Sequence, residues 1–210
     1  MEHVLEPTLI SALFWAATAA LGAELLLLGG RVRPDAARAP RGRRRAGRGS
    51  LLAIALAMGL AFGINSACHA QGWGNLPEPI AGWVRGLGVT LYAAGALLRL
   101  WAGRCLGAEF TREVRARPEQ PLVSHGPYRR LRHPLYTGLL AVALGLCAQF
   151  ANLPGLLAAA LLPGLALGWR VREEERLLEA TIGERYTRWR RGRGRLLPSW
   201  RAAPPGAGPP

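Results

Sequence analysis

The run "PLYTGLLAVALGLCAQFANLPGLLAAALLPGLALGW", residues 134–169, decides the fold. It is apolar almost throughout and long enough for two short membrane spans of about 17 residues each. In its middle, Asn152-Leu153-Pro154-Gly155 has the composition of a turn. The run therefore predicts a helical hairpin, 134–169, that brings the chain back to the membrane face from which it started.

Three more apolar runs precede this hairpin, at residues 8–28, 51–70 and 80–101. Hydrophobic residues make up 50% of the 210-residue chain, which is too large a share for an ordinary soluble domain of this size. Each of the three runs is long enough to cross a bilayer once. The sequence predicts an all-α, polytopic membrane protein of about five transmembrane helices.

The placement of the basic residues indicates how these helices are oriented. Arginines crowd segments 31–48 and 104–132 and the chain after Trp169, whereas residues 71–79 contain none. By the positive-inside rule, this alternation puts the N-terminus outside and the C-terminus in the cytoplasm. The near-exclusive use of arginine for positive charge, with abundant Ala, Gly and Pro, is typical of GC-rich coding. We therefore expect an integral protein of a bacterial inner membrane.

The formal net charge of +14 also raises the question of nucleic acid as a partner. Because the arginines follow the membrane topology, we expect the lipid bilayer as a partner and no nucleic acid. The basic, Gly- and Pro-rich segment 29–50 predicts a flexible cytoplasmic loop between the first two spans. Residues 1–107 thus form a unit of N-terminal transmembrane helices with this loop.

After the hairpin the pattern changes from apolar to amphipathic. One helix face would carry the apolar residues of this segment, which are Leu177, Leu178, Ile182, Tyr186 and Trp189. We expect an amphipathic cytoplasmic helix that continues from the last span, followed by a disordered tail, 201–210.

Several isolated polar residues have ordinary explanations. Arg85 and Arg99 lie near the ends of the third span, where long side chains can reach the headgroups, and we assign them no catalytic role. Cys68, Cys105 and Cys147 are scattered singly, without metal-ligand spacing. We expect no metal site.

Two polar segments flank the hairpin and should therefore meet at one membrane face. The first is "GPYRRLRHPLYTG", residues 126–138, and the second begins "RVREEERLLEATIGERYTRW", residues 170–189. Taken alone, each feature is ordinary: Pro134 suits the first turn of a helix, and the glutamates beside arginines suit a solvated helix face. The pairing of both segments across a short hairpin favours a binding site.

Together these segments resemble the isoprenylcysteine carboxyl methyltransferase family and, more distantly, the phospholipid N-methyltransferases. The RHPxYxG element, the R-x3-E-E element and the later GExY are in register, so that the resemblance covers about residues 120–200. It identifies residues 108–200 as a methyltransferase-like, cofactor-binding region.

The resemblance implies S-adenosyl-L-methionine as cofactor, held at the cytoplasmic membrane surface. It implies Arg170 as a catalytic and substrate-binding residue at the acceptor. The implied cofactor-binding positions are Glu113, Gln120, Pro121, Leu122, Val123, Tyr128, His133, Pro134, Leu135, Tyr136, Glu174 and Glu175. Which of Glu173, Glu174 and Glu175 faces the pocket stays open.

The residue chemistry is compatible with this cofactor. A glutamate of the run 173–175 can take its ammonium group, and a tyrosine can face its sulfonium by a cation–π attraction of about 0.5–2 kcal/mol. A carboxylate acceptor needs no general base, and Arg170 can hold it. If the acceptor were a thiol or an amine, His133 is the nearest candidate catalytic base.

We expect a hydrophobic small molecule or lipid as the acceptor, with carboxyl O-methylation of an isoprenylcysteine-like substrate as the first choice. The alternatives are phospholipid N-methylation, thiol S-methylation, an NADPH-dependent reductase of the sterol type and a non-catalytic membrane relative. The reductases tend to have asparagine within the HPxY element, where this chain has Leu135.

Overall fold

The computed structural model describes residues 43–107, 116 and 118–200. Four long helices run along a common direction: α2 (Arg43–Ala70), α3 (Ile80–Leu106), α4 (Pro134–Ala148) and α5 (Leu153–Ile182). A 3₁₀ turn, η3 (Gly126–Arg129), precedes α4, and a short helix, α6 (Glu184–Arg190), follows α5. In the described part of the chain the extended pairing is limited to two isolated bridges, so the all-α prediction is confirmed there.

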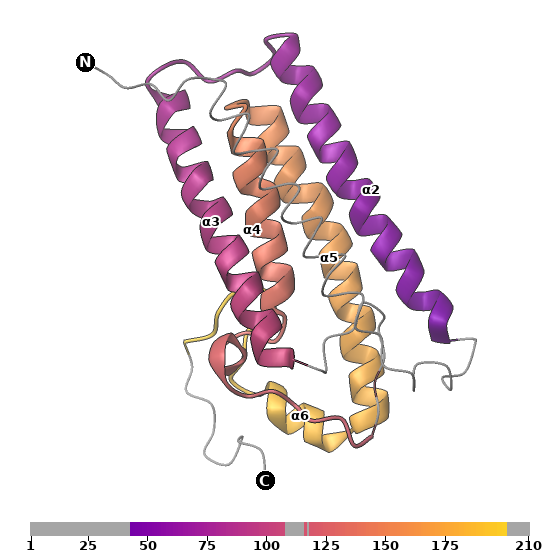
Figure 1. Cartoon of the computed structure of the whole chain (residues 1–210). Helices are drawn as coiled ribbons and strands as arrows, with labels where there is room; N and C mark the ends of the chain where they lie inside the picture. Colours follow the sequence, from indigo (N-terminus) through magenta and orange to yellow (C-terminus); the bar gives the residue numbers. More distant parts are fainter. Residues whose placement is uncertain (1–42, 108–115, 117, 201–210) are drawn as a thin grey trace.

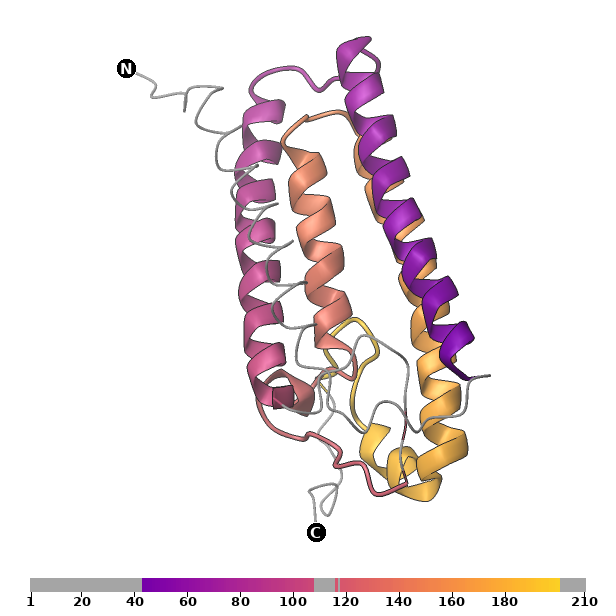
Figure 2. The same ribbon diagram turned by 45° about the vertical axis from the view of Figure 1, so that its right-hand side comes forward.

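The helices pack as two neighbouring pairs. Helix α3 lies against α4, and α2 lies along α5, while α4 and α5 join the pairs (Figures 1 and 2). The loops 71–79 and 149–152 close one end of the bundle. The start of α4, the C-terminal half of α5 and α6 lie at the opposite end. The hairpin therefore brings the two polar segments to the same end, as expected.

Three of these helices are long and apolar enough to cross a membrane: Gly49–Ala70, Ile80–Leu106 and Leu153–Ile182. Helix α4 is apolar but has only 15 residues. The hairpin is therefore unequal rather than two spans of the same length, because α5 continues without a break into the charged segment after Trp169 and reaches 30 residues. The predicted first span, 8–28, and the tail, 201–210, lie outside the described residues.

Two predicted boundaries are wrong. Helix α2 begins at Arg43, so that residues 43–50, which we expected in the flexible loop, form about two of its turns. Arginine has a high intrinsic helix propensity, which favours the earlier start. The single amphipathic helix expected after Trp169 is in fact interrupted, because Gly183 adopts a positive φ of 64° between α5 and α6.

Small residues allow α3 and α4 to pack closely. An ideal Cβ on Gly88 would lie 2.6 Å from the Cβ of Ala148, and one on Gly95 would lie 2.7 Å from the carbonyl oxygen of Gly138. Close approach at glycine is a common way for membrane helices to associate. Gly88 therefore lies at the helix contact, whereas a Cβ on Gly86 would meet nothing within 4 Å.

The close packing also explains why the expectation for Arg99 is wrong. Its side chain does not extend to the headgroups but is buried, with 5% exposed. Its stem passes Gly138, and its Nη1 donates a hydrogen bond of 3.0 Å to the carbonyl oxygen of Leu135. Arg99 thus ties α3 to the first turn of α4.

The end of the bundle opposite the polar segments is held by two buried asparagines. Asn152 caps α5 by accepting a 2.8 Å hydrogen bond from the backbone N–H of Gly155. Its Nδ2 donates to Asn65 Oδ1 at 2.8 Å, and Asn65 in turn donates to the carbonyl oxygen of Cys147. Three helices, α2, α4 and α5, therefore meet in one hydrogen-bonded cluster.

Candidate active site

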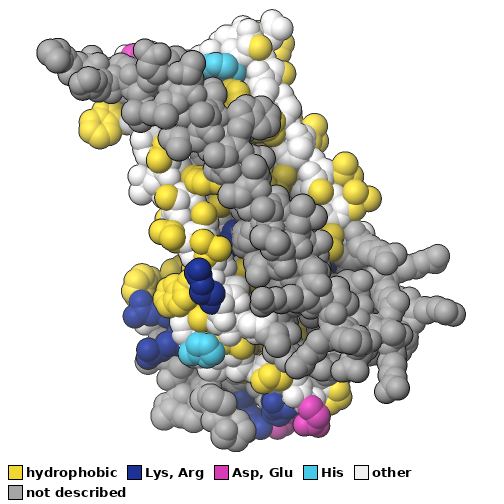
Figure 3. Space-filling view, in the orientation of Figure 1, with side chains coloured by type: hydrophobic (Ala, Val, Ile, Leu, Met, Phe, Trp, Pro, Cys, Tyr) yellow, Lys and Arg dark blue, Asp and Glu magenta, His cyan; other side chains and the backbone are white. Residues whose placement is uncertain are grey.

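Charged side chains of the described residues gather at the end of the bundle that holds η3 and α6. The space-filling view shows arginines at this end below a largely apolar flank (Figure 3). This distribution separates a hydrophobic body, suited to the bilayer, from a polar end where a soluble molecule has access.

A chain of polar contacts links α5, α4 and α2 at this end. The Tyr136 hydroxyl donates a hydrogen bond of 2.8 Å to Glu174 Oε2, and it accepts one of 3.1 Å from Arg170 Nε. Arg170 also donates from Nη1 to Ser50 Oγ at 2.7 Å. Arg170 and Ser50 are both buried, at 2% and 0% exposed. A residue of each predicted segment and one of α2 thus meet in a shielded place, where polar contacts are stronger than in water.

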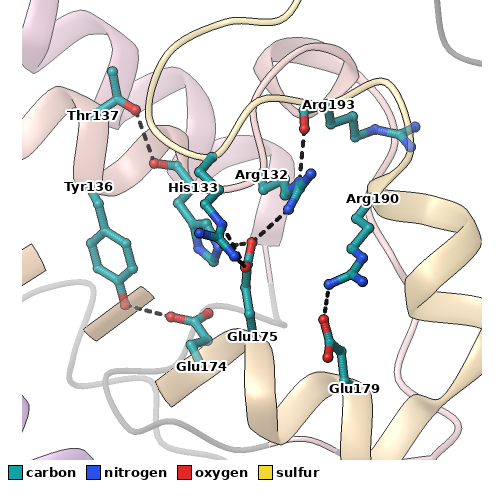
Figure 4. A network of polar contacts seen from close by, with 10 residues as sticks. Arg132, His133, Tyr136, Thr137, Glu174, Glu175, Glu179, Arg190 and Arg193 are labelled. Atoms are coloured by element: carbon teal, nitrogen blue, oxygen red, sulfur yellow. Dashed lines mark hydrogen bonds and ion pairs between the residues drawn. The ribbon is translucent and has the colours of Figure 1, made fainter. Parts of the chain in front are cut away.

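Glu175 lies on a different side of α5 and is surrounded by cations (Figure 4). Its carboxylate accepts a 3.0 Å hydrogen bond from Arg132 Nη1 and a 2.9 Å hydrogen bond from Arg195 Nε. The Nε2 of His133 lies 3.5 Å from Glu175 Oε1. Successive helix positions differ by about 100° in direction, so Glu174 faces Tyr136 while Glu175 faces the arginines.

His133 occupies the residue before α4 and is 6% exposed. Its imidazole stacks on the Tyr136 ring at 5.7 Å between centroids, with 17° between the planes. Pro134 follows at the start of the helix, as predicted, and is fully buried. The HPxY element is therefore a rigid helix start that presents an imidazole and a phenol side by side.

The C-terminal segment 193–200 runs across this element. The backbone N–H groups of Arg132 and His133 donate to the carbonyl oxygens of Gly194 and Arg195, at 2.8 and 3.2 Å. Thr137 Oγ1 donates to the carbonyl oxygen of Leu196 at 2.7 Å. No sequence pattern predicted this strap, residues 193–200, because its contacts are mostly with backbone atoms and need no particular side-chain pattern.

The predicted loop positions lie against α6. Leu122, Val123 and Leu135 pack around a buried cluster of Ala102, Tyr128, Tyr186 and Trp189. Trp189 Nε1 donates to the carbonyl oxygen of Val123 at 3.0 Å, and Arg185 Nη2 donates to that of Gln120 at 3.3 Å. Helix α6 therefore fixes the course of loop 118–124. Glu113 lies outside the described residues.

Burial also sets the ionisation of the tyrosines in this cluster. Burial raises the pKa of the Tyr128 hydroxyl, and the negative charge of Glu174 raises it further. Burial likewise raises the pKa of Tyr186, with a contribution from the charge of Glu175. Both phenols are neutral at physiological pH and present hydroxyl groups as hydrogen-bond donors.

The turn before Tyr128 requires a glycine. Gly126 has a φ of +58°, and a Cβ there would lie 2.5 Å from Cys105 Sγ at the end of α3. Residues other than glycine are strained in this backbone region. Gly126 thus allows the RHPxYxG segment to pack directly on α3.

Three buried polar atoms at this end lack a hydrogen-bond partner among the described residues: His133 Nε2, Glu173 Oε2 and the Tyr186 hydroxyl. A buried polar group without a partner costs about 1–3 kcal/mol, so such groups are usually satisfied by a ligand or by water. No group of three or more potential metal ligands occurs in the described part of the chain. A carboxylate, an imidazole and phenols can together hold an organic cation.

The fold and the site together define an integral membrane protein whose helical bundle carries a cluster of buried polar side chains at one end. Residues 88–180 match the family of isoprenylcysteine carboxyl methyltransferases. In this region, which is a little under half of the chain, the protein is similar to that family. The match begins within α3 and ends within α5, so it includes the HPxY element and the glutamate run.

Individual relatives agree with this assignment. Protein-S-isoprenylcysteine O-methyltransferases B and A of Arabidopsis thaliana are 29% identical over 109 residues and 30% identical over 106 residues. These matches cover 51% and 50% of this chain. The chain spans just over half of the relatives' own length, at 55% and 54%.

The fold has a counterpart among solved structures. A eukaryotic intramembrane Ras methyltransferase, isoprenylcysteine carboxyl methyltransferase, superposes with a TM-score of 0.66 over 92% of this chain and 68% of that protein. Its sequence is 18% identical, so this likeness concerns the arrangement of the helices.

Proposed function

We propose that the protein is an S-adenosyl-L-methionine-dependent membrane methyltransferase that methylates the carboxylate of a hydrophobic, isoprenylcysteine-like acceptor. The observation that carries this proposal is the contact chain Glu174–Tyr136–Arg170, which joins the two predicted segments in one buried place. The similarity to proteins named protein-S-isoprenylcysteine O-methyltransferases supports the choice of reaction.

The described residues fit this cofactor. Glu174 supplies a carboxylate for its ammonium group, while Tyr136 and Tyr128 supply aromatic surface for the sulfonium. Glu173 Oε2, and His133 Nε2 beyond its 3.5 Å contact with Glu175 Oε1, offer further hydrogen-bonding capacity at the same end. When bound, the cofactor supplies an electrophilic methyl group on a sulfonium. Glu175, by contrast, acts by holding Arg132 and Arg195.

On the acceptor side, the guanidinium of Arg170 holds the carboxylate. Arginine has five N–H donors in a planar arrangement, and it matches a carboxylate geometrically. When the acceptor is held beside the methyl donor, the two reactants no longer have to meet by diffusion, which lowers the entropic part of the barrier. Burial of Arg170 and Tyr136 also excludes water from the reacting atoms. A carboxylate is already ionised, so this reaction uses no general base, and His133 serves to bind rather than to remove a proton.

The polar end of the bundle faces the cytoplasm in this proposal, because the basic residues of the described chain concentrate there. The soluble cofactor then enters from water, and the acceptor's apolar chain enters from the bilayer. The same arrangement fits a bacterial inner membrane with the N-terminus outside.

Calorimetric titration of the detergent-purified protein with S-adenosylhomocysteine and, separately, NADPH tests the cofactor. We expect binding of S-adenosylhomocysteine alone, and about tenfold weaker binding by Glu174→Gln. Glu78→Gln, which alters an exposed carboxylate at the other end, is the control. Binding of NADPH alone would instead favour a reductase.

Transfer of a labelled methyl group tests the acceptor. We expect N-acetyl-S-farnesylcysteine to be methylated, whereas its methyl ester, phosphatidylethanolamine and decanethiol are not. Methylation of the amine or the thiol in place of the carboxylate would overturn the choice of acceptor but not that of the cofactor.

A further inference from the structure

Three helices converge on the guanidinium group of Arg170. The residue itself belongs to α5, Tyr136 of α4 contacts its Nε at 3.1 Å, and Ser50 of α2 contacts its Nη1 at 2.7 Å. Contacts at two different nitrogens restrict rotation of the guanidinium plane as well as its position. The orientation of Arg170 therefore depends on α2 as much as on α4.

Ser50 differs from the other residues of the site in where it comes from. It lies 120 positions before Arg170 in the chain and well before residues 88–180, which match the family. Its side chain is fully buried, with 0% exposed. A hydroxyl in such a place is expected to be hydrogen-bonded, and Arg170 is a partner of this one.

Building on the proposed function, we propose that Ser50 is a positioning residue that orients Arg170 for the acceptor carboxylate, so that α2 completes the acceptor side of the site. A bidentate arginine–carboxylate contact needs the guanidinium plane in a defined orientation. Tyr136 contacts both Arg170 and Glu174, whereas the contact of Ser50 described here is with Arg170. Loss of the Ser50 hydroxyl should therefore affect the acceptor without affecting the cofactor.

The variants Ser50→Ala and Ser50→Cys separate the hydrogen bond from packing. Alanine removes the hydroxyl, while cysteine fills the space with a slightly larger thiol that hydrogen-bonds only weakly. Thr90→Val is the matched control, because the Thr90 hydroxyl bonds only to the carbonyl oxygen of Gly86 in its own helix, at 3.1 Å. All variants are made in the full chain and purified in detergent.

Two readouts test the variants. The first is the rate at which phenylglyoxal, an arginine-specific reagent, modifies Arg170, followed by mass spectrometry. The second is steady-state kinetics, which gives KM and kcat with N-acetyl-S-farnesylcysteine as acceptor, together with a separate titration of the affinity for S-adenosylhomocysteine. We expect both Ser50 variants to raise the modification rate severalfold and the KM for the acceptor about tenfold. Affinity for S-adenosylhomocysteine should stay unchanged, and Thr90→Val should behave as the wild type.

An unchanged modification rate and KM in Ser50→Ala would overturn the inference, as would wild-type behaviour of Ser50→Cys, since packing alone would then suffice. These results are distinct from a failure of the proposed function. If the wild type methylates no carboxylate but both variants expose Arg170 to the reagent, the reaction is wrong and the positioning of Arg170 by Ser50 stands.

Discussion

The Tyr136 hydroxyl stands between Arg170 and Glu174, accepting a hydrogen bond from the first at 3.1 Å and donating one to the second at 2.8 Å. One phenol thus connects the residue proposed for the acceptor with the residue proposed for the cofactor.

Replacing Tyr136 by phenylalanine should therefore affect both substrates. Hydrogen bonds to charged groups contribute about 1.5–3 kcal/mol, so we expect kcat/KM to fall by about 10- to 100-fold and S-adenosylhomocysteine to bind more weakly. Steady-state kinetics and calorimetry measure the two effects. Tyr92→Phe, on α3, is the control. A loss confined to the acceptor would show that Tyr136 does not act on the cofactor side.

Glu175 should matter more for stability than its partner Arg195. Glu175 is 3% exposed and contacts Arg132 and Arg195, whereas the Arg195 side chain is 55% exposed. Removing a buried charge from a pair leaves uncompensated partners and costs about 3–5 kcal/mol, while an exposed partner contributes about 0–1 kcal/mol. We expect Glu175→Gln to lower the thermal midpoint far more than Arg195→Ala.

Arg85→Ala serves as the control for this comparison, because Arg85 pairs with Glu78 at the exposed opposite end. Its thermal midpoint should match the wild type. If Arg195→Ala proved as damaging as Glu175→Gln, the exposed ion pair, rather than the buried carboxylate, would be the main support of the strap 193–200.

The close contact between α3 and α4 predicts that two glycines of α3 differ sharply in the stability they lose when changed to alanine. A Cβ on Gly95 would lie 2.7 Å from the carbonyl oxygen of Gly138, so Gly95→Ala forces the helices apart. We expect a loss of about 1–3 kcal/mol in the free energy of unfolding. Gly86→Ala, where a Cβ meets nothing within 4 Å, should be neutral or slightly stabilising. Unfolding in detergent with increasing denaturant distinguishes the two.

The asparagine cluster at the other end should affect stability without affecting ligand binding. Asn152→Ala removes the cap of α5 and the hydrogen bonds to Asn65. We expect a loss of about 1–3 kcal/mol in the free energy of unfolding and an unchanged affinity for S-adenosylhomocysteine. Asn75→Ala, whose exposed side chain makes a 3.4 Å contact with the carbonyl oxygen of His69, is the control. A weakened affinity would show that the two ends of the bundle are coupled.

The indole of Trp189 on α6 should hold the loop before η3 in place. Trp189 Nε1 donates to the carbonyl oxygen of Val123 and to Ser124 Oγ, both at 3.0 Å. Trp189→Phe keeps an aromatic ring but loses both hydrogen bonds. We expect the affinity for S-adenosylhomocysteine to fall by about three- to tenfold, while Trp83→Phe, at an 80% exposed position, changes nothing. An unchanged affinity would exclude this loop from the cofactor site.

The sequence by itself determined the helical class, the membrane character and the meeting of the two polar segments. Long apolar runs can form only helices or closed barrels in a bilayer, and a short hairpin returns the chain to its starting face. The positions of Tyr136, Arg170 and Glu174 on facing helices follow from these local facts. Their hydrogen bonds confirm that the two segments meet.

Only the tertiary structure decided which side chains pair. It assigned Glu174 to Tyr136 and Glu175 to the arginines, buried Arg99 between α3 and α4, and brought Ser50 to Arg170. Hydrophobic periodicity reports the apolar face of a helix, but not its rotation to within one residue or its distance from a neighbour. Those quantities depend on glycine contacts, caps and backbone hydrogen bonds between segments far apart in the chain, and the packing of the whole bundle sets them.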